Sequence, residues 1–265
     1  LEFEFKNRYT IDDLLNIMKI LRSENGCPWD KVQTHESIRT DLIEETYEVC
    51  EGIDANSPEM LREELGDLLM QVVFHSQIET EQGNFNFDDV CNDICQKLVY
   101  RHPHVFGTVQ ADTEEEVLKN WDALKKKSKH QETSTETLES VPKTFPALLR
   151  GEKVCKRASR AGLPIDGANV FIDRIKSAVD ELDIADVDEK IAHNQQILGN
   201  ILLSFCNLDR ILKTDGEKAL TYSTNRFIMK FRAVENEVVQ NGGSLDKLSD
   251  EELSCIVDSL FSTGL

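Results

Sequence analysis

Two pairs of acidic residues have the spacing that could hold a cation. Glu45 and Glu48 lie three residues apart in one segment, and Glu64 and Asp67 lie three residues apart in the next. Residues at i and i+3 project from the same face of an α-helix, so each pair presents two carboxylates on one side. Four converging carboxylates repel one another, and a bound cation removes that repulsion. Ligands that are all oxygen favour Mg²⁺ or Mn²⁺ over zinc.

The alternative interpretation is that these carboxylates are solvated faces of acidic helices, the usual state of a run of glutamates. The neighbouring apolar residues argue against it. They recur at helical period beside both pairs, and Glu64 and Asp67 border an apolar stripe that includes Leu65. A carboxylate at the edge of a core is unfavourable without a partner. A metal ion is the partner that we expect.

Charge and composition restrict the class of partner. The 265 residues include 30 lysines and arginines and 49 aspartates and glutamates, which gives a net charge of −19. Such an acidic surface does not attract nucleic acids or anionic membranes. No apolar run reaches the roughly 18 residues of a membrane span, and no signal peptide opens the sequence. We therefore expect no nucleic-acid partner and no membrane association.

The cysteines indicate a reducing compartment. There are seven, an odd number, no C-x-x-C motif occurs, and most of them lie inside apolar patterns. We therefore expect reduced, buried thiols in a cytoplasmic protein. The sequence begins with Leu1 rather than a methionine, which is compatible with a segment of a longer chain.

Helical periodicity accounts for most of the chain. The predicted helices of the first half lie at about 10–24, 34–54, 57–82 and 87–102. Thr10 and Ser57 have the side chains of N-cap residues, and a proline follows Ser57 at the first helical position. Gly83 ends the third helix. Because strand signals are nearly absent, we predict an all-α protein.

A polar stretch divides the chain into two helical units. Residues 125–150, which begin with three lysines and continue with serine, threonine and glutamate, have the composition of a solvated linker. We predict a first unit at 1–124 and a second at 151–265. After the linker the pattern starts again, since Gly162-Leu163-Pro164-Ile165-Asp166 has the form of Gly26-Cys27-Pro28-Trp29-Asp30.

The second unit repeats the first without its acidic motif. Leu65-Gly66 aligns with Leu198-Gly199, and this register has no gap between the two acidic motifs. Three of the four acidic positions then hold other residues, namely Ala178 for Glu45, Ile197 for Glu64 and Asn200 for Asp67. Glu181 stands at the position of Glu48. We therefore expect that the second unit does not hold the metal.

Several linked motifs resemble those of the MazG nucleoside triphosphate pyrophosphohydrolases. In order, they are CPWDKVQTHESI, the two acidic pairs, VVFHSQIE and KLVYRHPHVFG, all between Gly26 and Val109. The resemblance is weaker in the second half, where a tandem unit would have lost its acidic motif. It implies an all-α NTP pyrophosphatase bundle, a homodimer and Mg²⁺ dependence. It also implies hydrolysis of (d)NTPs to the monophosphate and pyrophosphate.

The resemblance gives further residues a role. Mg²⁺ held by the four carboxylates would bind triphosphate oxygens and acidify a water for attack on the α-phosphorus. Glu44 is the candidate base for that water, and its alternative role is a solvated neighbour of the ligands. Lys97 and Arg101, one turn apart, would bind phosphate, and Arg62 is a further candidate. Trp121 would stack on the nucleotide base.

Other functions have less support. Di-iron carboxylate proteins use Glu-x-x-His pairs and another class of phosphohydrolase uses a His-Asp dipeptide, and the sequence contains neither. His75 falls in an apolar stripe, so we interpret it as a structural histidine with satisfied hydrogen bonds. A non-catalytic helical scaffold that binds nucleotides or a partner protein is the remaining alternative. The two units could also pair within one chain, in place of the expected homodimer.

Overall fold

The computed structural model describes residues 3–128, 131–163, 167–183 and 189–261. These residues form helices and no strand, which confirms the all-α prediction. The chain divides into two compact units, Leu1–Lys125 and Lys126–Leu265. None of the described helices is long and apolar enough to cross a membrane.

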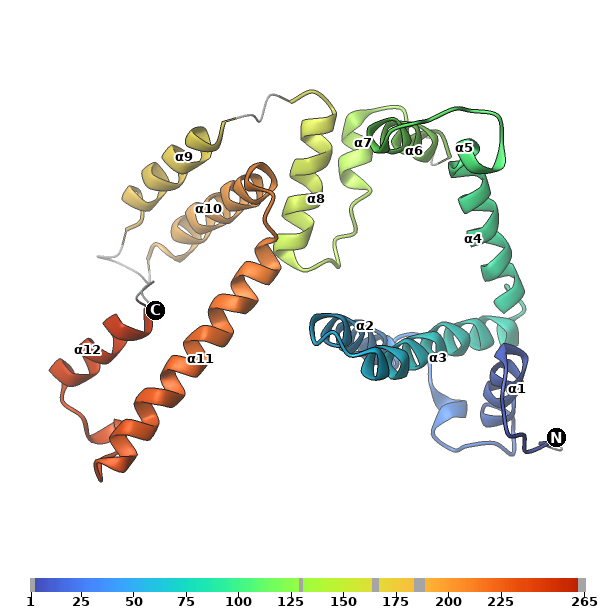
Figure 1. Cartoon of the computed structure of the whole chain (residues 1–265), viewed down its shortest axis with the longest axis horizontal. Helices are drawn as coiled ribbons and strands as arrows, with labels where there is room; N and C mark the ends of the chain where they lie inside the picture. Colours follow the sequence, from blue (N-terminus) through green and yellow to red (C-terminus); the bar gives the residue numbers. More distant parts are fainter. Residues whose placement is uncertain (1–2, 129–130, 164–166, 184–188, 262–265) are drawn as a thin grey trace. The chain divides into compact units, whose positions relative to one another are not determined.

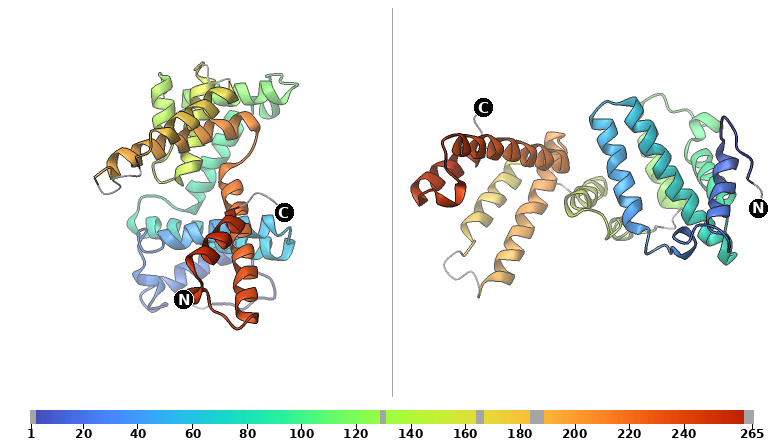
Figure 2. Two further views of the ribbon diagram at one scale, coloured as in Figure 1. Left: turned by 90° about the vertical axis from the view of Figure 1, so that its left-hand side faces the viewer. Right: turned by 90° about the horizontal axis from the view of Figure 1, so that it is seen from below.

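A helical hairpin dominates the first unit. The elements in chain order are α1 (Ile11–Leu21), the 3-10 helix η1 (Asp30–Val32), α2 (Arg39–Asp54), α3 (Pro58–Gln82), α4 (Phe87–Arg101), α5 (Pro103–Phe106) and α6 (Glu114–Ser128). Helices α2 and α3 lie side by side as the hairpin, and α1 packs against α3 (Figures 1 and 2). Helix α4 leaves from the carboxyl end of α3 (Figure 1).

Local signals set the ends of α3 where the sequence predicts them. The Ser57 Oγ accepts a hydrogen bond from the Met60 N–H at 3.3 Å, and Pro58 occupies the first helical position. Gly83 ends the helix with φ of 78°, a conformation that glycine adopts without steric penalty. These contacts confirm the predicted cap and terminator, and the cap at Ser57 fixes where the hairpin turns.

Two features hold the hairpin together. Its core is formed by buried apolar side chains of α1, α3 and the segment before α2, namely Met18, Ile38, Val73, Phe74 and Ile78. At the closed end of the hairpin, Gly52 lies so close to Leu61 that an added Cβ would be 3.0 Å from the Leu61 backbone nitrogen. A side chain at this position would push the two helices apart. The glycine therefore permits their close approach.

The second unit contains a similar hairpin. Its elements are α7 (Ser134–Glu139), α8 (Ala147–Arg160), α9 (Ala168–Asp180), α10 (Ile191–Leu212), α11 (Gly216–Gln240), the 3-10 helix η2 (Leu245–Lys247) and α12 (Asp250–Phe261). Helices α9 and α10 lie side by side, and α8 packs against α10. The shift that aligns Leu65 with Leu198 also aligns Pro58, the first residue of α3, with Ile191, the first residue of α10. The same shift would place the end of α2 at position 187, whereas α9 already ends at Asp180, so the predicted register without a gap holds for α10 and not for α9.

Two expectations from composition need correction. The stretch predicted as a solvated linker contains α7, and the Arg157 guanidinium of α8 donates to the Ser140 hydroxyl just after α7, at 2.7 Å. Val141 is buried, so this part of the stretch packs against the second unit. All seven cysteines are free thiols, but only Cys155 and Cys206 are buried, and the expectation of burial was wrong for four that are exposed, namely Cys50, Cys91, Cys95 and Cys255.

Candidate metal centre

The two acidic motifs meet across the hairpin. Glu45 and Glu48 lie one turn apart on α2, and Glu64 lies on α3. One carboxylate oxygen from each of these three residues lies within 4.8 Å of those of the other two. Glu45 and Glu64 are half-buried and Glu48 is exposed. The group thus offers three oxygen donors at a site that solvent can reach, which suits a hard divalent cation.

The electrostatics of the group also favour a cation. Burial raises the pKa of the Glu45 carboxyl, and the charges of Asp67, Glu48 and Glu64 raise it further. Burial likewise raises the pKa of Glu64, with Glu48 as the largest charge contribution. Both shifts mean that the ionised carboxylates are disfavoured by one another and by loss of water. A positive charge placed between them would reverse both effects.

Asp67 lies beside this group but is not one of the three that meet the distance limit. It follows Glu64 by one turn on α3, and its charge raises the pKa of both Glu45 and Glu64. Its position is therefore compatible with the predicted role of a fourth ligand. Glu44, the candidate base, is exposed on α2, and Arg62 is exposed on α3 just before the second acidic motif.

The predicted phosphate and base contacts lie on other helices. Lys97 and Arg101 belong to the second half of α4, which begins beyond the carboxyl end of α3, at the end of the hairpin opposite to the α2–α3 turn (Figure 1). The Cζ of Arg101, which is buried, lies 5.5 Å from the centroid of the Trp121 ring. The His102 ring meets the same indole edge-on at 4.9 Å. The structure thus brings Arg101 and Trp121 together, on different helices from the carboxylates.

A chain of polar side chains that the sequence did not predict connects the segment before α2 to α3. It lies at the open end of the hairpin, which is the end opposite to the α2–α3 turn. The His35 Nε2 lies 2.6 Å from the Glu79 Oε1, and the His35 Nδ1 lies 2.7 Å from the His75 Nδ1. The Asn84 side chain donates to the second Glu79 oxygen at 2.7 Å. The interpretation of His75 as a satisfied structural histidine was incomplete, because its buried Nε2 has no hydrogen-bond partner among the described residues. Counting outward from the α2–α3 turn would have placed His35 opposite the stretch between His75 and Glu79.

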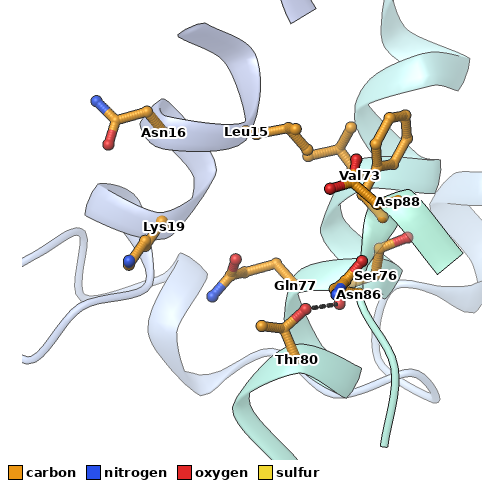
Figure 3. A pocket seen from close by; sticks show the side chains of 10 residues that line it. Leu15, Asn16, Lys19, Val73, Ser76, Gln77, Thr80, Asn86 and Asp88 are labelled. Atoms are coloured by element: carbon orange, nitrogen blue, oxygen red, sulfur yellow. Dashed lines mark hydrogen bonds between the residues drawn. The ribbon is translucent and has the colours of Figure 1, made fainter. Parts of the chain in front are cut away.

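A hollow of about 220 Å³ lies where α1, α3 and the start of α4 meet (Figure 3). Lys19, Gln77 and Asn86 contribute polar groups to its wall, and Leu15 and Val73 contribute apolar ones. None of the predicted site residues lines it. It opens on the side of α3 opposite to Glu64 and Asp67, because its α3 residues lie about half a turn away from them around the helix. We assign it no part in the candidate metal centre.

Comparison with known proteins links these features to one family. A model of the MazG nucleotide pyrophosphohydrolase domain matches residues 33–106, a range that includes both acidic motifs. A nucleoside triphosphate pyrophosphohydrolase of Escherichia coli (strain K12) is 40% identical over 237 residues, which cover 88% of this chain and 89% of the relative. The Thermotoga maritima protein called nucleoside triphosphate pyrophosphohydrolase/pyrophosphatase MazG is 37% identical over 242 residues, or 91% and 92%. A nucleoside triphosphate pyrophosphohydrolase of Mycobacterium tuberculosis is 37% identical over 174 residues, or 65% and 51%.

Proposed function

The chain belongs to the MazG family of nucleoside triphosphate pyrophosphohydrolases, and we propose that its first unit hydrolyses (d)NTPs to the monophosphate and pyrophosphate with Mg²⁺ as cofactor. One observation carries this proposal. Glu45, Glu48 and Glu64 bring their oxygens within 4.8 Å of one another at a site open to solvent. Only carboxylates make up this donor set, which fits Mg²⁺, with Mn²⁺ as a substitute.

The chemistry divides between the cofactor and the side chains. When bound, Mg²⁺ neutralises triphosphate oxygens and lowers the pKa of a coordinated water. Glu45, Glu48, Glu64 and Asp67 hold the cation. Glu44, exposed on α2 beside them, takes the proton of the attacking water. The water oxygen bonds to the α-phosphorus while the bond from that phosphorus to the bridging oxygen breaks, so pyrophosphate leaves.

We further propose that the working molecule is a homodimer. The α2–α3 hairpin exposes an apolar stripe on each helix, namely Ile43, Tyr47, Leu65, Leu69 and Val72. Monomers seldom expose extended apolar patches, and a second copy of the chain would cover this one. A dimer also offers a source for the phosphate contacts. In such a dimer, Lys97, Arg101 and Trp121 of one chain would contribute to the site formed by the carboxylates of the other.

Two measurements test the dimer. Sedimentation should give twice the chain mass of 30.1 kDa at micromolar concentration. Mixing inactive Glu48→Gln protein with inactive Lys97→Ala protein should restore activity if one site uses residues of both chains. A fully active monomer would contradict the dimer. A dimer that shows no recovery on mixing would place Lys97 and the carboxylates of one site in the same chain.

The second unit, in this proposal, is a degenerate copy that does not hold the metal. Ala178 and Ile197 offer no oxygen ligand, and Asn200 offers an uncharged amide. Ile197 is buried, so that position contributes to packing. Glu181 follows the last residue of α9 as its C-cap. A single carboxylate does not bind Mg²⁺ firmly.

The activity test uses purified protein with each NTP and dNTP in turn, with and without Mg²⁺. Pyrophosphate should appear as the first product, and omission of Mg²⁺ should abolish it. Asp67→Asn should remove activity while it leaves helical content unchanged, because it removes charge at a half-buried position without changing the size of the side chain. Orthophosphate as the first product would indicate attack at the γ-phosphorus and contradict the proposal. Unaltered turnover in Asp67→Asn would exclude that residue as a ligand.

A further inference from the structure

Four polar side chains form a continuous chain at the open end of the α2–α3 hairpin. Asn84 donates to Glu79, Glu79 pairs with the His35 Nε2, and the His35 Nδ1 contacts the His75 Nδ1, with successive distances of 2.7, 2.6 and 2.7 Å. The two imidazole rings are nearly parallel, at 10°, with centroids 5.0 Å apart. His35 lies in the segment before α2, whereas His75 and Glu79 lie on α3. The chain therefore fastens one arm of the hairpin to the other.

Proton counting limits the charge that this chain can hold. The Glu79 carboxylate can only accept, so the His35 Nε2 carries a proton. A single hydrogen can lie between the two Nδ1 atoms, because two N–H groups would oppose each other at 2.7 Å. A second positive charge would thus break the contact. Even the first positive charge on the pair places a proton on the His75 Nε2, which is buried without an acceptor among the described residues.

The surroundings favour the state with a neutral His75. Burial lowers the pKa of His75, and the charge of His35 lowers it further. The hydrogen bonds from Asn84 and then from His35 lower the pKa of Glu79, which stays ionised. The other charged groups nearby are Glu36, exposed beside His35, and Glu81, whose carboxylate is paired with Arg22 at 2.8 Å. Neither touches the imidazole pair, so the pair responds to pH through its own protons.

The carboxylates of the candidate metal centre lie between two fixed points of the hairpin. At the closed end, the contact of Gly52 with Leu61 sets the distance between α2 and α3. At the open end, the His35–His75 contact sets the distance between α3 and the segment that leads into α2. The acidic group, which repels itself, lies between them on the same two helices. Release of the open end would let this repulsion separate the oxygens that a cation must bridge.

We propose that the contact between His35 and His75 is a clamp that positions the metal-binding carboxylates. A second positive charge on the two rings breaks this contact, releases the clamp and weakens binding of the divalent cation. The proposal rests on the proposed function of the acidic group. His35 and His75 are positioning residues, since they act through the helices and touch neither the cation nor the substrate. Arg22 supports the same segment independently, because it donates to the Asp30 and Gln33 carbonyls at 2.6 and 3.2 Å.

The direction of the pH effect follows from the lowered pKa of His75. The unfolded chain takes up this proton at the ordinary histidine value of about 6.5, and the folded chain takes it up only at lower pH. Stabilisation by the neutral ring is therefore complete above that value and is lost as the pH falls through the folded value. Clamp release should accordingly occur on the acid side of neutrality.

Binding of Mn²⁺ tests the clamp without any turnover. His35→Gln and His75→Gln should weaken Mn²⁺ binding about tenfold at about pH 7.5, because they remove a contact that orients the ligands. Both should also show a shallower fall in affinity between about pH 7.5 and 5.5 than the wild type, since the contact that acid pH breaks is already absent from them. His193→Gln, an exposed histidine on α10, is the matched control and should leave both quantities unchanged. Wild-type affinity and wild-type pH dependence in both clamp variants would overturn the proposal.

Histidine NMR titration of the wild type, without metal, keeps the test independent of folding defects in the variants. The resonances of His35 and His75 should respond to each other's protonation, and the second proton should enter only with loss of their contact. Independent titration of the two rings near the ordinary value would overturn the clamp while leaving the metal centre intact. Unchanged Mn²⁺ binding in Glu48→Gln would overturn the metal centre, and with it the role of the clamp in metal binding. A coupled titration of the two histidines would in that case still support their contact.

Discussion

The two helical hairpins of this chain have a similar framework and different charges. Leu65 and Leu198 occupy aligned positions and are exposed to nearly the same extent, 48% and 49%. Where the first hairpin carries the half-buried Glu64, the second carries Ile197, which is only 5% exposed. A buried isoleucine stabilises a fold by about 1.5–3 kcal/mol relative to an exposed one. The second hairpin thus gains packing at a position where the first has a carboxylate that is disfavoured without a cation.

This comparison separates what the fold requires from what the site requires. Apolar residues at helical period are present in both hairpins and are sufficient to form them. In the first hairpin, burial and then the charges of neighbouring carboxylates raise the pKa of the half-buried Glu45 and Glu64. Carboxylates that oppose the stability of the fold in this way are typical of binding sites. The variants below test that distinction.

The largest expected effect is on activity. The double variant Glu45→Gln with Glu64→Gln should lower pyrophosphate release by about a thousandfold, since removal of metal ligands forfeits several kcal/mol of charge stabilisation. The matched control is Glu181→Gln, which changes the one acidic residue that the sequence register aligns with a proposed ligand, Glu48. It should retain full activity. Equal losses in the two variants would show that both hairpins contribute to one site.

The next largest effect is on stability. Ile197→Glu restores a carboxylate to the second hairpin but buries it without a partner, which should destabilise the protein by about 3 kcal/mol in urea unfolding. Leu198→Glu is the control, because the Leu198 side chain, next to Ile197 in the sequence, is 49% exposed and a charge there remains in water. If Ile197→Glu proved as stable as the wild type and bound Mn²⁺, the second hairpin would be a latent metal site rather than a packing unit.

A smaller effect is expected at the closed end of the first hairpin. Gly52→Ala places a methyl group 3.0 Å from the Leu61 nitrogen, so the helices must separate, at a cost of about 1–3 kcal/mol. Affinity for Mn²⁺ should fall with it. Gly199→Ala on α10 is the control, because nothing lies within 4 Å of the added Cβ and alanine favours the helix. Unfolding in urea and Mn²⁺ titration measure both quantities, and a Gly52→Ala protein equal to wild type in each would show that the close approach is not required.

The smallest effect concerns the metal-free protein. Because the folded-state pKa of Glu45 lies above its ordinary value of 4.5, the folded chain holds this proton more tightly than the unfolded chain. Stability from that source is present at acid pH and is lost as the pH rises through the raised value. At neutral pH, Glu45→Gln should therefore raise the melting temperature without metal and reduce the further rise that Mg²⁺ produces. A lower melting temperature in metal-free Glu45→Gln would contradict the repulsion.

Local signals in the sequence were sufficient for the framework. The cap at Ser57, the proline that follows it and the glycine at position 83 each act within a few residues, and the structure confirms all three. The meeting of Glu45, Glu48 and Glu64 also followed from helical period, because a short turn makes the two helices antiparallel neighbours.

Contacts between distant segments were harder to predict. The pairing of His35 with His75 depends on the register between the segment before α2 and a helix forty residues later, which counting outward from the α2–α3 turn gives only to within about one helical turn. The helix α7 inside the expected linker depends on its packing against α8, which overrides a composition typical of solvated segments. The exposure of Cys50 and Cys91 similarly depends on which faces of α2 and α4 the rest of the unit covers.

Metal titration of two single variants tests the central claim most directly, that the first hairpin and not the second binds the divalent cation. Mn²⁺ binding is followed by electron paramagnetic resonance in the wild type, in Glu48→Gln and in Glu181→Gln, all at neutral pH. Glu48→Gln should lose binding and Glu181→Gln should retain that of the wild type. Binding that persists in Glu48→Gln and disappears in Glu181→Gln would contradict the account.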